Sequence, residues 1–110
     1  MALCALQINF ELSVKREDYL AACEHAVNAV ADVPQLEWKL WILSDDGQRA
    51  GGLYLFRNRS AAEAYVNGPI IGRLRASGLT RDLEVRMFSV VESLSVRTGG
   101  ARVLPTAAPL

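Results

Sequence analysis

The chain has 110 residues, 51% of them hydrophobic, and its 12 basic residues balance 12 acidic ones, so the formal net charge is zero. This length predicts a single domain, and the apolar content predicts a packed core rather than a disordered chain. The balanced charge, without a basic block, argues against a protein that binds nucleic acid or a membrane surface, since both need a basic patch.

The sequence contains few residues that could bind a metal or a cofactor, and no segment typical of a membrane protein. Its N-terminus lacks a basic region followed by a long apolar stretch, and no apolar run reaches the roughly 18 residues of a membrane span. We therefore expect a cytoplasmic protein without a membrane partner. Cys4 and Cys23 have no CxxC spacing and His25 is the single histidine, so soft metal ligands are too few. No glycine-rich dinucleotide loop follows a strand, and we expect no metal and no cofactor.

The first half of the chain predicts a strand, a helix and a hairpin. Residues 3–12 alternate between apolar and polar side chains, which predicts a strand. Residues 16–31 carry apolar side chains at helical spacing. Two strands follow at about 35–44 and 49–57, joined by a turn at Asp45-Asp46-Gly47.

The second half predicts two short helices and a strand. Ser60 is expected to cap the first helix, with Glu63 completing a capping box. Gly68-Pro69 ends it, because proline cannot continue the hydrogen-bond ladder. A helix over 69–77 and a strand over 80–92 follow.

The element order β-α-β-β-α-β predicts an α+β, ferredoxin-like domain over residues 1–95. In this fold a four-stranded antiparallel sheet carries both helical segments on one face. Residues 96–110 lack periodicity and contain Gly99-Gly100. They form a C-terminal tail that we expect to be loose or packed on a partner subunit.

The hairpin is apolar or aromatic on both faces, although a half-buried sheet needs only one apolar face. A two-residue turn would pair Trp41 with Gly52 and Lys39 with Tyr54, whereas a three-residue loop would bring Trp38 opposite Tyr54. We prefer the first register and expect the even positions to lie under the helices; these are Leu36, Trp38, Leu40 and Ile42. Trp41, Tyr54 and Phe56 would then lie on the open face.

That open face is the expected functional surface, because spare aromatic area indicates a ligand cavity, a subunit interface or both. We therefore expect a homodimer formed across it. Besides one tryptophan, the face would carry six further side chains of interest: Gln7, Asn9, Tyr54, Phe56, Arg86 and Phe88.

Three strings of the sequence resemble the YdhR-type mono-oxygenases of the dimeric α/β-barrel superfamily. They are Trp38-Lys-Leu-Trp41, Ala50-Gly-Gly-Leu-Tyr-Leu-Phe56 and Ser60-Ala-Ala-Glu-Ala-Tyr65. The resemblance covers roughly residues 5–95. It implies a homodimeric α/β barrel whose two sheets face one another, with a pocket in each subunit between sheet and helices or within the barrel. It also implies oxygenation of a small aromatic compound without metal, haem or flavin.

Quinone-forming members of the superfamily use an Asn and a Trp to bind and polarise a phenolic substrate. By this resemblance Asn9 and Trp41 are the candidate catalytic residues, although Trp38 could replace Trp41 and Phe56 stands where many relatives carry the Trp. Haem-degrading relatives use a His on the second helix, and residues 60–77 contain none. The candidate substrate-binding residues are Gln7, Trp38, Tyr54, Phe56, Arg86 and Phe88.

Structural roles remain open for several of these residues. Asn9 could lie exposed at the barrel rim or form a hydrogen bond across the dimer, Trp41 and Tyr54 could be dimer contacts, and Arg86 could pair with Glu11 or Glu37 across strands.

The resulting hypothesis is a cofactor-independent mono-oxygenase that acts on a small aromatic or phenolic compound in a hydrophobic pocket of a homodimer. The alternatives are a non-catalytic small-molecule binding or stress-response protein, and an isomerase or cyclase acting on an aromatic, polyketide-like substrate. A buried titratable group with a shifted pKa would favour catalysis, and purely apolar walls would favour binding.

Overall fold

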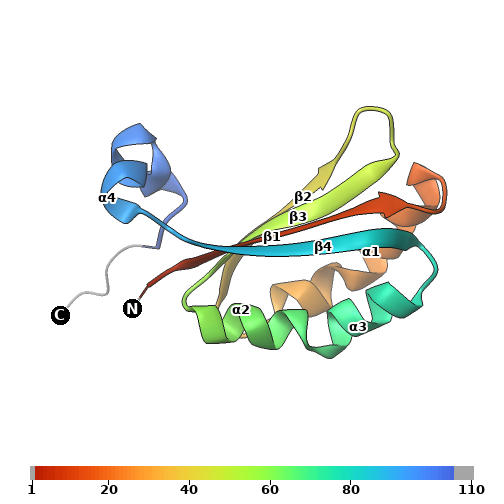
Figure 1. The fold of residues 1–110 in the computed structure, drawn as a ribbon, viewed down its shortest axis with the longest axis horizontal. Helices are drawn as coiled ribbons and strands as arrows, with labels where there is room; N and C mark the ends of the chain where they lie inside the picture. Colours follow the sequence, from red (N-terminus) through yellow and green to blue (C-terminus); the bar gives the residue numbers. More distant parts are fainter. Residues whose placement is uncertain (1, 106–110) are drawn as a thin grey trace.

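A computed structural model describes residues 2–105 of the chain. It confirms the α+β, ferredoxin-like fold, with a four-stranded antiparallel sheet covered by helices on one face (Figure 1). The strands and main helices are β1 (Cys4–Leu12), α1 (Arg16–Ala31), β2 (Leu36–Leu43), β3 (Arg49–Phe56), α2 (Arg59–Val66), α3 (Pro69–Ala76) and β4 (Thr80–Ser89).

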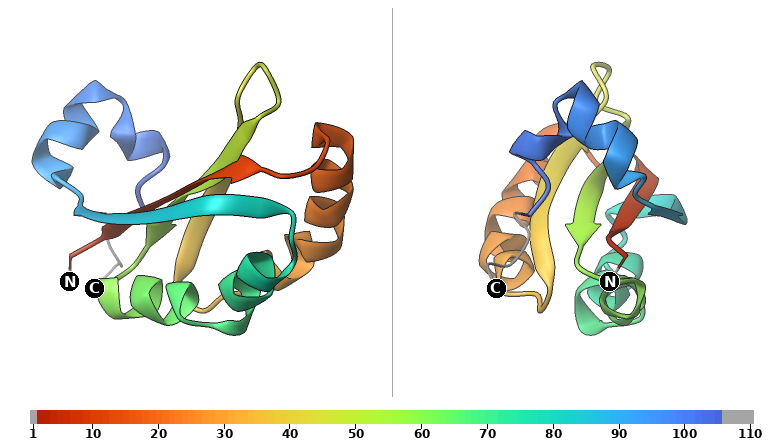
Figure 2. Two further views of the ribbon diagram at one scale, coloured as in Figure 1. Left: turned by 45° about the vertical axis from the view of Figure 1, so that its right-hand side comes forward. Right: turned by 90° about the vertical axis from the view of Figure 1, so that its left-hand side faces the viewer.

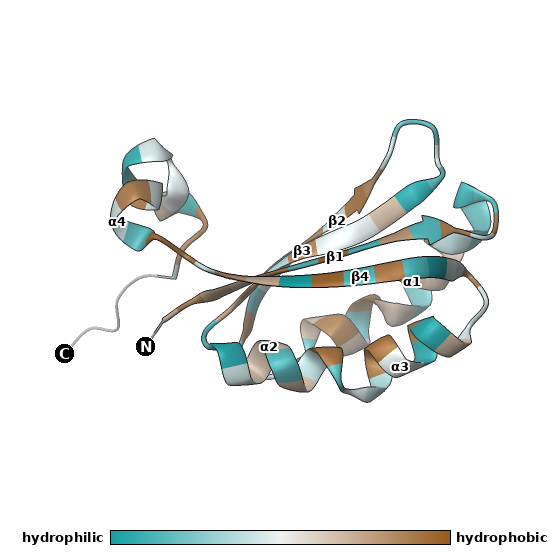
Figure 3. Ribbon diagram, in the orientation of Figure 1, coloured by the Kyte–Doolittle hydropathy of each residue, from teal (hydrophilic) through white to brown (hydrophobic). Residues whose placement is uncertain are grey.

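The sheet has the strand order β2-β3-β1-β4, and each neighbouring pair is antiparallel. β1 is therefore central, with its even-numbered side chains buried and the odd-numbered ones between them only partly buried. The same alternation is visible along β4, where hydrophobic and hydrophilic residues succeed one another (Figure 3). In β4 the side chains Leu83, Val85 and Met87 pack against the core, as the sequence predicts.

The preferred register of the hairpin is confirmed. Trp41 lies opposite Gly52 and Lys39 lies opposite Tyr54. Gly47 closes the turn with a φ of 72°, and the Asp46 carboxylate accepts hydrogen bonds from the hydroxyl of Ser44 and the amide of Gln48. A positive φ suits glycine because a side chain is disfavoured there.

The predicted assignment of the hairpin to the two faces is wrong. Residues directly opposite one another on neighbouring strands point to the same face, and Tyr54 lies opposite Leu6, which faces the helices. Tyr54 and Phe56 are therefore buried under the helices, and Trp41 lies on that side too. Conversely Trp38, Leu40 and Ile42, together with Leu53 and Leu55, lie on the open face. Leu36 does pack against the core as predicted, because the register shifts between Leu36 and Trp38.

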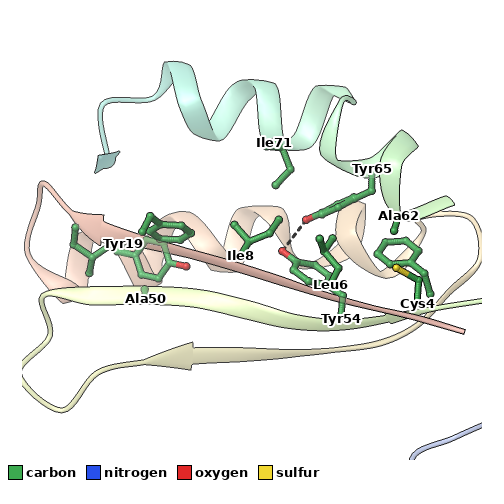
Figure 4. Close-up of a cluster of buried hydrophobic side chains, with 12 residues drawn as sticks. Cys4, Leu6, Ile8, Tyr19, Ala50, Tyr54, Ala62, Tyr65 and Ile71 are labelled. Atoms are coloured by element: carbon green, nitrogen blue, oxygen red, sulfur yellow. Dashed lines mark hydrogen bonds between the residues drawn. The ribbon is translucent and has the colours of Figure 1, made fainter. Parts of the chain in front are cut away.

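Aromatic side chains dominate one end of the core between the sheet and α2 (Figure 4). Tyr65 projects from α2 onto the sheet. The centroid of its ring lies 5.0 Å from that of Tyr54 and 5.7 Å from that of Phe56. At the other end Phe10 meets Tyr19 edge to face at 5.7 Å. Such pairs add about 0.5–1.5 kcal/mol each to the stabilisation from burial alone.

The start of α2 differs from the prediction. The side-chain oxygen of Asn58, rather than Ser60, accepts a hydrogen bond from the Ala61 amide at 2.8 Å, so the helix begins at Arg59. Asn is as good an N-cap as Ser, and its position one residue before the helix decides the choice. Glu63 pairs instead with Arg59 at 3.0 Å. Pro69 opens α3 directly after Gly68, as the sequence predicts.

The C-terminal segment forms short helical turns that follow β4. They are α4 (Glu92–Ser95), η1 (Val96–Thr98) and η2 (Gly100–Arg102), so β4 ends at Ser89, before the predicted residue 92. They lie on the opposite side of the sheet from α1, α2 and α3 (Figure 2). The Trp38 indole donates a hydrogen bond to the Val103 carbonyl at 2.6 Å, which ties this segment to β2. The predicted tail residues 106–110 lie outside the described residues.

Candidate functional site

A cavity of about 300 Å³ lies between the helix-covered face of the sheet and the helices α1 and α3. Its walls are mostly apolar and aromatic, and Trp41, with 40% of its surface exposed, stands at its edge. A volume of this size is at the small end of ligand pockets, which suits a ligand of a few fused rings at most.

Lys39 brings an amine into this apolar cavity. Its nitrogen Nζ lies 3.3 Å from the centroid of the Trp41 ring and 4.8 Å from that of Tyr54. None of the four ion pairs in the described part of the chain includes Lys39. Burial lowers the pKa of Lys39 to about 8, although the neighbouring Cys23 acts in the opposite direction. A fraction of Lys39 is therefore unprotonated near neutral pH and able to accept a proton, whereas an exposed lysine is almost fully protonated there.

Gly52 makes this position of Lys39 possible. A Cβ atom at residue 52 would lie 2.7 Å from Cε of Lys39 and 2.9 Å from Cε1 of Tyr54. The lysine stem and the tyrosine ring thus occupy the space above the glycine. Its neighbour Gly51 is needed for a different reason, because a Cβ there would lie 2.0 Å from the Ile8 carbonyl oxygen on β1.

Two hydroxyl groups meet at the same cavity. The phenol oxygens of Tyr54 and Tyr65 are 3.0 Å apart, and either can be the donor (Figure 4). Burial raises the pKa of Tyr54 far above its usual value, and Tyr65 adds to that effect. Burial also raises the pKa of Tyr65, partly offset by its hydrogen bond with Tyr54. Both side chains consequently remain neutral hydrogen-bond donors throughout the physiological pH range.

The charged side chains that line the cavity are basic. Lys39 from β2 and Arg73 from α3 line it, and its described lining includes no Asp or Glu. With no carboxylate to balance these cations, the field in the cavity favours a ligand that carries negative charge.

The structure separates the predicted site residues into two groups. Trp41 and Tyr54 line the cavity, and Phe56 lies on the same side of the sheet within the core. The remaining predicted residues lie on the open face; they are Gln7, Asn9, Trp38, Arg86 and Phe88. The expected convergence of Asn9, Tyr54 and Arg86 on one face does not occur.

The open-face residues have their own surroundings. Asn9 lies opposite Gly51 on β3 and Glu84 on β4. Arg86 is 3.9 Å from Glu84 on its own strand, and the two glutamates considered as its cross-strand partners, Glu11 and Glu37, pair with other arginines. The predicted roles of these residues in binding or catalysis stay predictions.

Sequence reasoning missed Lys39, Arg73 and the polar role of Tyr65. For Lys39 a signal was present, because the preferred register already placed it opposite Tyr54 and two residues from Trp41. Arg73 had none, since only the packing of α3 over the sheet brings it to the cavity.

The described residues 2–105 carry neither a metal-ligand cluster nor a membrane-spanning helix. No group of three or more His, Cys, Asp or Glu side chains is arranged there to hold a metal ion. Among the described helices, none has the length and apolar character required to cross a bilayer.

The family described as "Putative mono-oxygenase ydhR" matches residues 5–101, nearly the whole chain, and the protein belongs to this family. No protein of curated function matches the sequence.

Solved structures with the same fold include two oxygenases. A protein of unknown function from Nitrosomonas europaea, NE2512, is 19% identical, with a TM-score of 0.68 over 83% of this chain and 91% of its own. The cofactor-independent oxygenase SnoaB from Streptomyces nogalater is 13% identical, with a TM-score of 0.66 over 82% and 94% of the two chains. The ActVA-Orf6 monooxygenase from Streptomyces coelicolor, solved with the ligand nanaomycin D, is 12% identical, with a TM-score of 0.64 over 81% and 88%. At these identities the likeness concerns the fold.

Proposed function

We propose that the protein is a cofactor-independent mono-oxygenase that oxidises a small hydroxylated aromatic compound in the cavity between the sheet, α1 and α3. The observation that carries this proposal is an amine with a pKa of about 8, Lys39, set among aromatic side chains in a largely apolar cavity. A purely apolar cavity would support simple binding, whereas a group that can exchange a proton at neutral pH supports proton transfer. Membership of a mono-oxygenase family supports the oxidation itself.

The chemistry needs no group beyond the substrate and dioxygen. An anthrone-like ring that has lost its acidic proton is electron-rich, and it passes an electron to dioxygen. The two radicals combine at the ring carbon to form a peroxide anion, which takes back one proton, and loss of water from the resulting hydroperoxide leaves a carbonyl. One oxygen atom of dioxygen thus enters the product, and the other leaves in water with the two hydrogens of the original CH₂ group. The apolar walls serve this step because they exclude bulk water from the anion.

We further propose that the working unit is a homodimer formed through the open face of the sheet. Leu40 on β2 is 55% exposed and Phe88 on β4 is 50% exposed, and both lie on this face. The helical turns beyond β4 add further exposed apolar side chains, including Leu94. A second copy of the chain is the partner that this face would suit, and an obligate interface of this type buries about 2,000 Å² or more in total.

The activity is tested with an anthrone that carries an acidic hydroxyl, in buffer treated to remove metals. We expect oxygen uptake that depends on native protein, a product absorbance typical of a quinone, and one ¹⁸O atom in the product under ¹⁸O₂. Heat-denatured protein at the same concentration controls for spontaneous oxidation. Tight binding without turnover would support the alternative of a non-catalytic binding protein.

A further inference from the structure

We propose that the cavity binds its hydroxylated aromatic ligand as the phenolate anion, with Lys39 as both the acceptor of the phenol proton and the counter-ion of the product anion. The link to oxidation rests on the proposed function, whereas the binding chemistry can be tested without it.

First, the Lys39 amine is placed where it could meet a phenol. Nζ of Lys39 lies against the ring of Trp41 and within 4.8 Å of the Tyr54 ring, and no carboxylate neutralises it among the described residues. A partly buried charge that meets aromatic rings but no carboxylate is costly, and groups in such surroundings cluster at functional sites. Because Nζ covers one face of the Trp41 ring, a flat ligand would meet the amine from within the cavity, with its hydroxyl oxygen towards Nζ.

The second argument is the set of neutral donors beside it. Between the Tyr54 and Tyr65 hydroxyls, one hydrogen is used in the bond that joins them. The other hydrogen has no acceptor among the described residues, so it is free to donate to an anionic oxygen. Hydrogen bonds to a charged acceptor are roughly twice as strong as neutral ones.

The third argument is charge. Arg73 adds a second cation to the lining and no described Asp or Glu opposes it. Other titratable side chains that line the cavity are Tyr19, Cys23 and His25. For Tyr19, burial and the nearby Cys23 raise the pKa, so it remains neutral alongside the other two tyrosines.

The proton transfer balances without any further reactant. The O–H bond of the phenol breaks, its proton forms a new N–H bond on the neutral amine of Lys39, and the electron pair stays on oxygen. The resulting ammonium and phenolate form an ion pair of zero net charge. Where Lys39 is already protonated, the phenolate enters from solution and gives the same complex.

The proposal is tested with 4-nitrophenol, whose phenolate absorbs at a longer wavelength than its neutral form. We expect binding to the wild-type protein to lower the apparent pKa of the dye by at least one unit, which corresponds to a tenfold preference for the anion. Lys39→Met should abolish this shift and weaken phenolate binding about tenfold or more. Lys15→Met is the matched control, because Lys15 is exposed and is the other lysine of the sequence. Lys39→Arg should still bind the phenolate, because a guanidinium also serves as its counter-ion, but it cannot take the proton from the neutral phenol, so binding by this variant should weaken as the pH falls below the pKa of the free dye.

A second measurement uses the wild-type protein alone. With labelled lysine, NMR resolves just two side chains; ligand binding should raise the pKa of Lys39, and the signal of the exposed Lys15 serves as an internal reference. An unshifted dye, or a Lys39→Met variant that binds as the wild type does, would overturn the proposal. Anion binding without any oxygenation would contradict the proposed function and leave this inference standing. Oxygenation at the wild-type rate by Lys39→Met would contradict the role given to Lys39 and leave the proposed oxygenase function standing.

Discussion

The hydroxyl of Tyr54 lies 3.0 Å from that of Tyr65 and joins β3 to α2 beside the cavity. Both side chains are almost fully buried, so a hydroxyl that loses its partner has little access to bulk water. The pair therefore contributes to stability as well as to the site, because an unpaired buried hydroxyl costs about 1–3 kcal/mol.

Replacing one member of the tyrosine pair should destabilise the protein, because the remaining hydroxyl loses its partner. We expect Tyr65→Phe to lower the free energy of unfolding by about 1 kcal/mol. The double variant Tyr54→Phe/Tyr65→Phe should cost less than the sum of the two single changes. Urea denaturation of all four proteins gives the coupling energy, and strictly additive effects would show that the two hydroxyls do not interact.

Stability should depend on pH through Lys39. Its pKa is about 8 in the folded chain and 10.5 in the reference state, so between these values the unfolded chain binds more protons. The free energy of unfolding must then increase as the pH rises from 8 towards 10. Below pH 8, where Lys39 is protonated in both states, it stays at its lower level. The buried tyrosines have raised pKa values and become destabilising only at higher pH, as the unfolded chain loses its phenol protons.

The same argument predicts a stabilising substitution. Lys39→Met should raise the free energy of unfolding at pH 7 by about 1–2 kcal/mol, allowing for the part of the side chain that still reaches solvent. The gain should shrink at pH 9.5. Lys15→Met should change neither value, and denaturant titrations at the two pH values make the comparison.

Gly52→Ala tests the space that Lys39 occupies. The added methyl group would displace the lysine stem and the Tyr54 ring, so we expect a loss of about 1–3 kcal/mol in stability. We also expect weaker binding of 4-nitrophenol. Gly72→Ala in α3 is the matched control: its Cβ would meet nothing within 4 Å, and alanine should stabilise the helix by up to about 1 kcal/mol. Equal effects of the two substitutions would contradict the packing described for Gly52.

The proposed dimer can be separated from the cavity by mutation. Leu40→Glu places a carboxylate on the open face and should produce a monomer in sedimentation experiments, because that carboxylate would lose its water on dimerisation. Leu20→Glu on α1 changes a side chain that is similarly exposed, at 42%, on the helical side of the domain, and should leave the dimer intact. Trp41→Glu, also on the helical side, should alter ligand binding rather than assembly. A wild-type protein that stays monomeric at micromolar concentration would exclude the dimer.

Mutations on the two faces of the sheet can show on which face the reaction takes place. If the reaction takes place in the cavity, Lys39→Met should abolish it at neutral pH while Asn9→Ala has a small effect. A loss of about 10²-fold with Asn9→Ala would instead indicate that the Asn9 amide stabilises an oxyanion on the open face. Steady-state rates of the two variants, each checked for folding, decide between the faces.

The sequence contained enough to predict the fold, because each strand and helix has its own local pattern. It could not settle which face of the hairpin meets the helices, since Leu53 and Leu55 are as apolar as their neighbours Tyr54 and Phe56. Alternation identifies the face of a strand only when one side is polar. The pairing of Leu6 on β1 with Tyr54 on β3 determines which face of the hairpin meets the helices. This contact joins residues far apart in the sequence, so no local pattern reports it.

The site depended on the same long-range information. The preferred register placed Lys39 beside Tyr54, but its burial follows from α1 and α3, whose positions over the sheet no local pattern reports. Asn9 was favoured through a resemblance and an assumed face, and it lies across the sheet from the cavity.

Trp38 and Trp41 are three residues apart in a regular stretch of β2, which places their side chains on opposite faces of the sheet, so the chain has a separate fluorophore for each of these faces. Trp38 is held by the backbone of the C-terminal segment, whereas Trp41 borders the cavity beside an amine. In a Trp41→Phe variant the remaining emission would report events at the open face, and in a Trp38→Phe variant it would report occupancy of the cavity. Assembly and ligand binding could thus be followed optically and independently in one small protein.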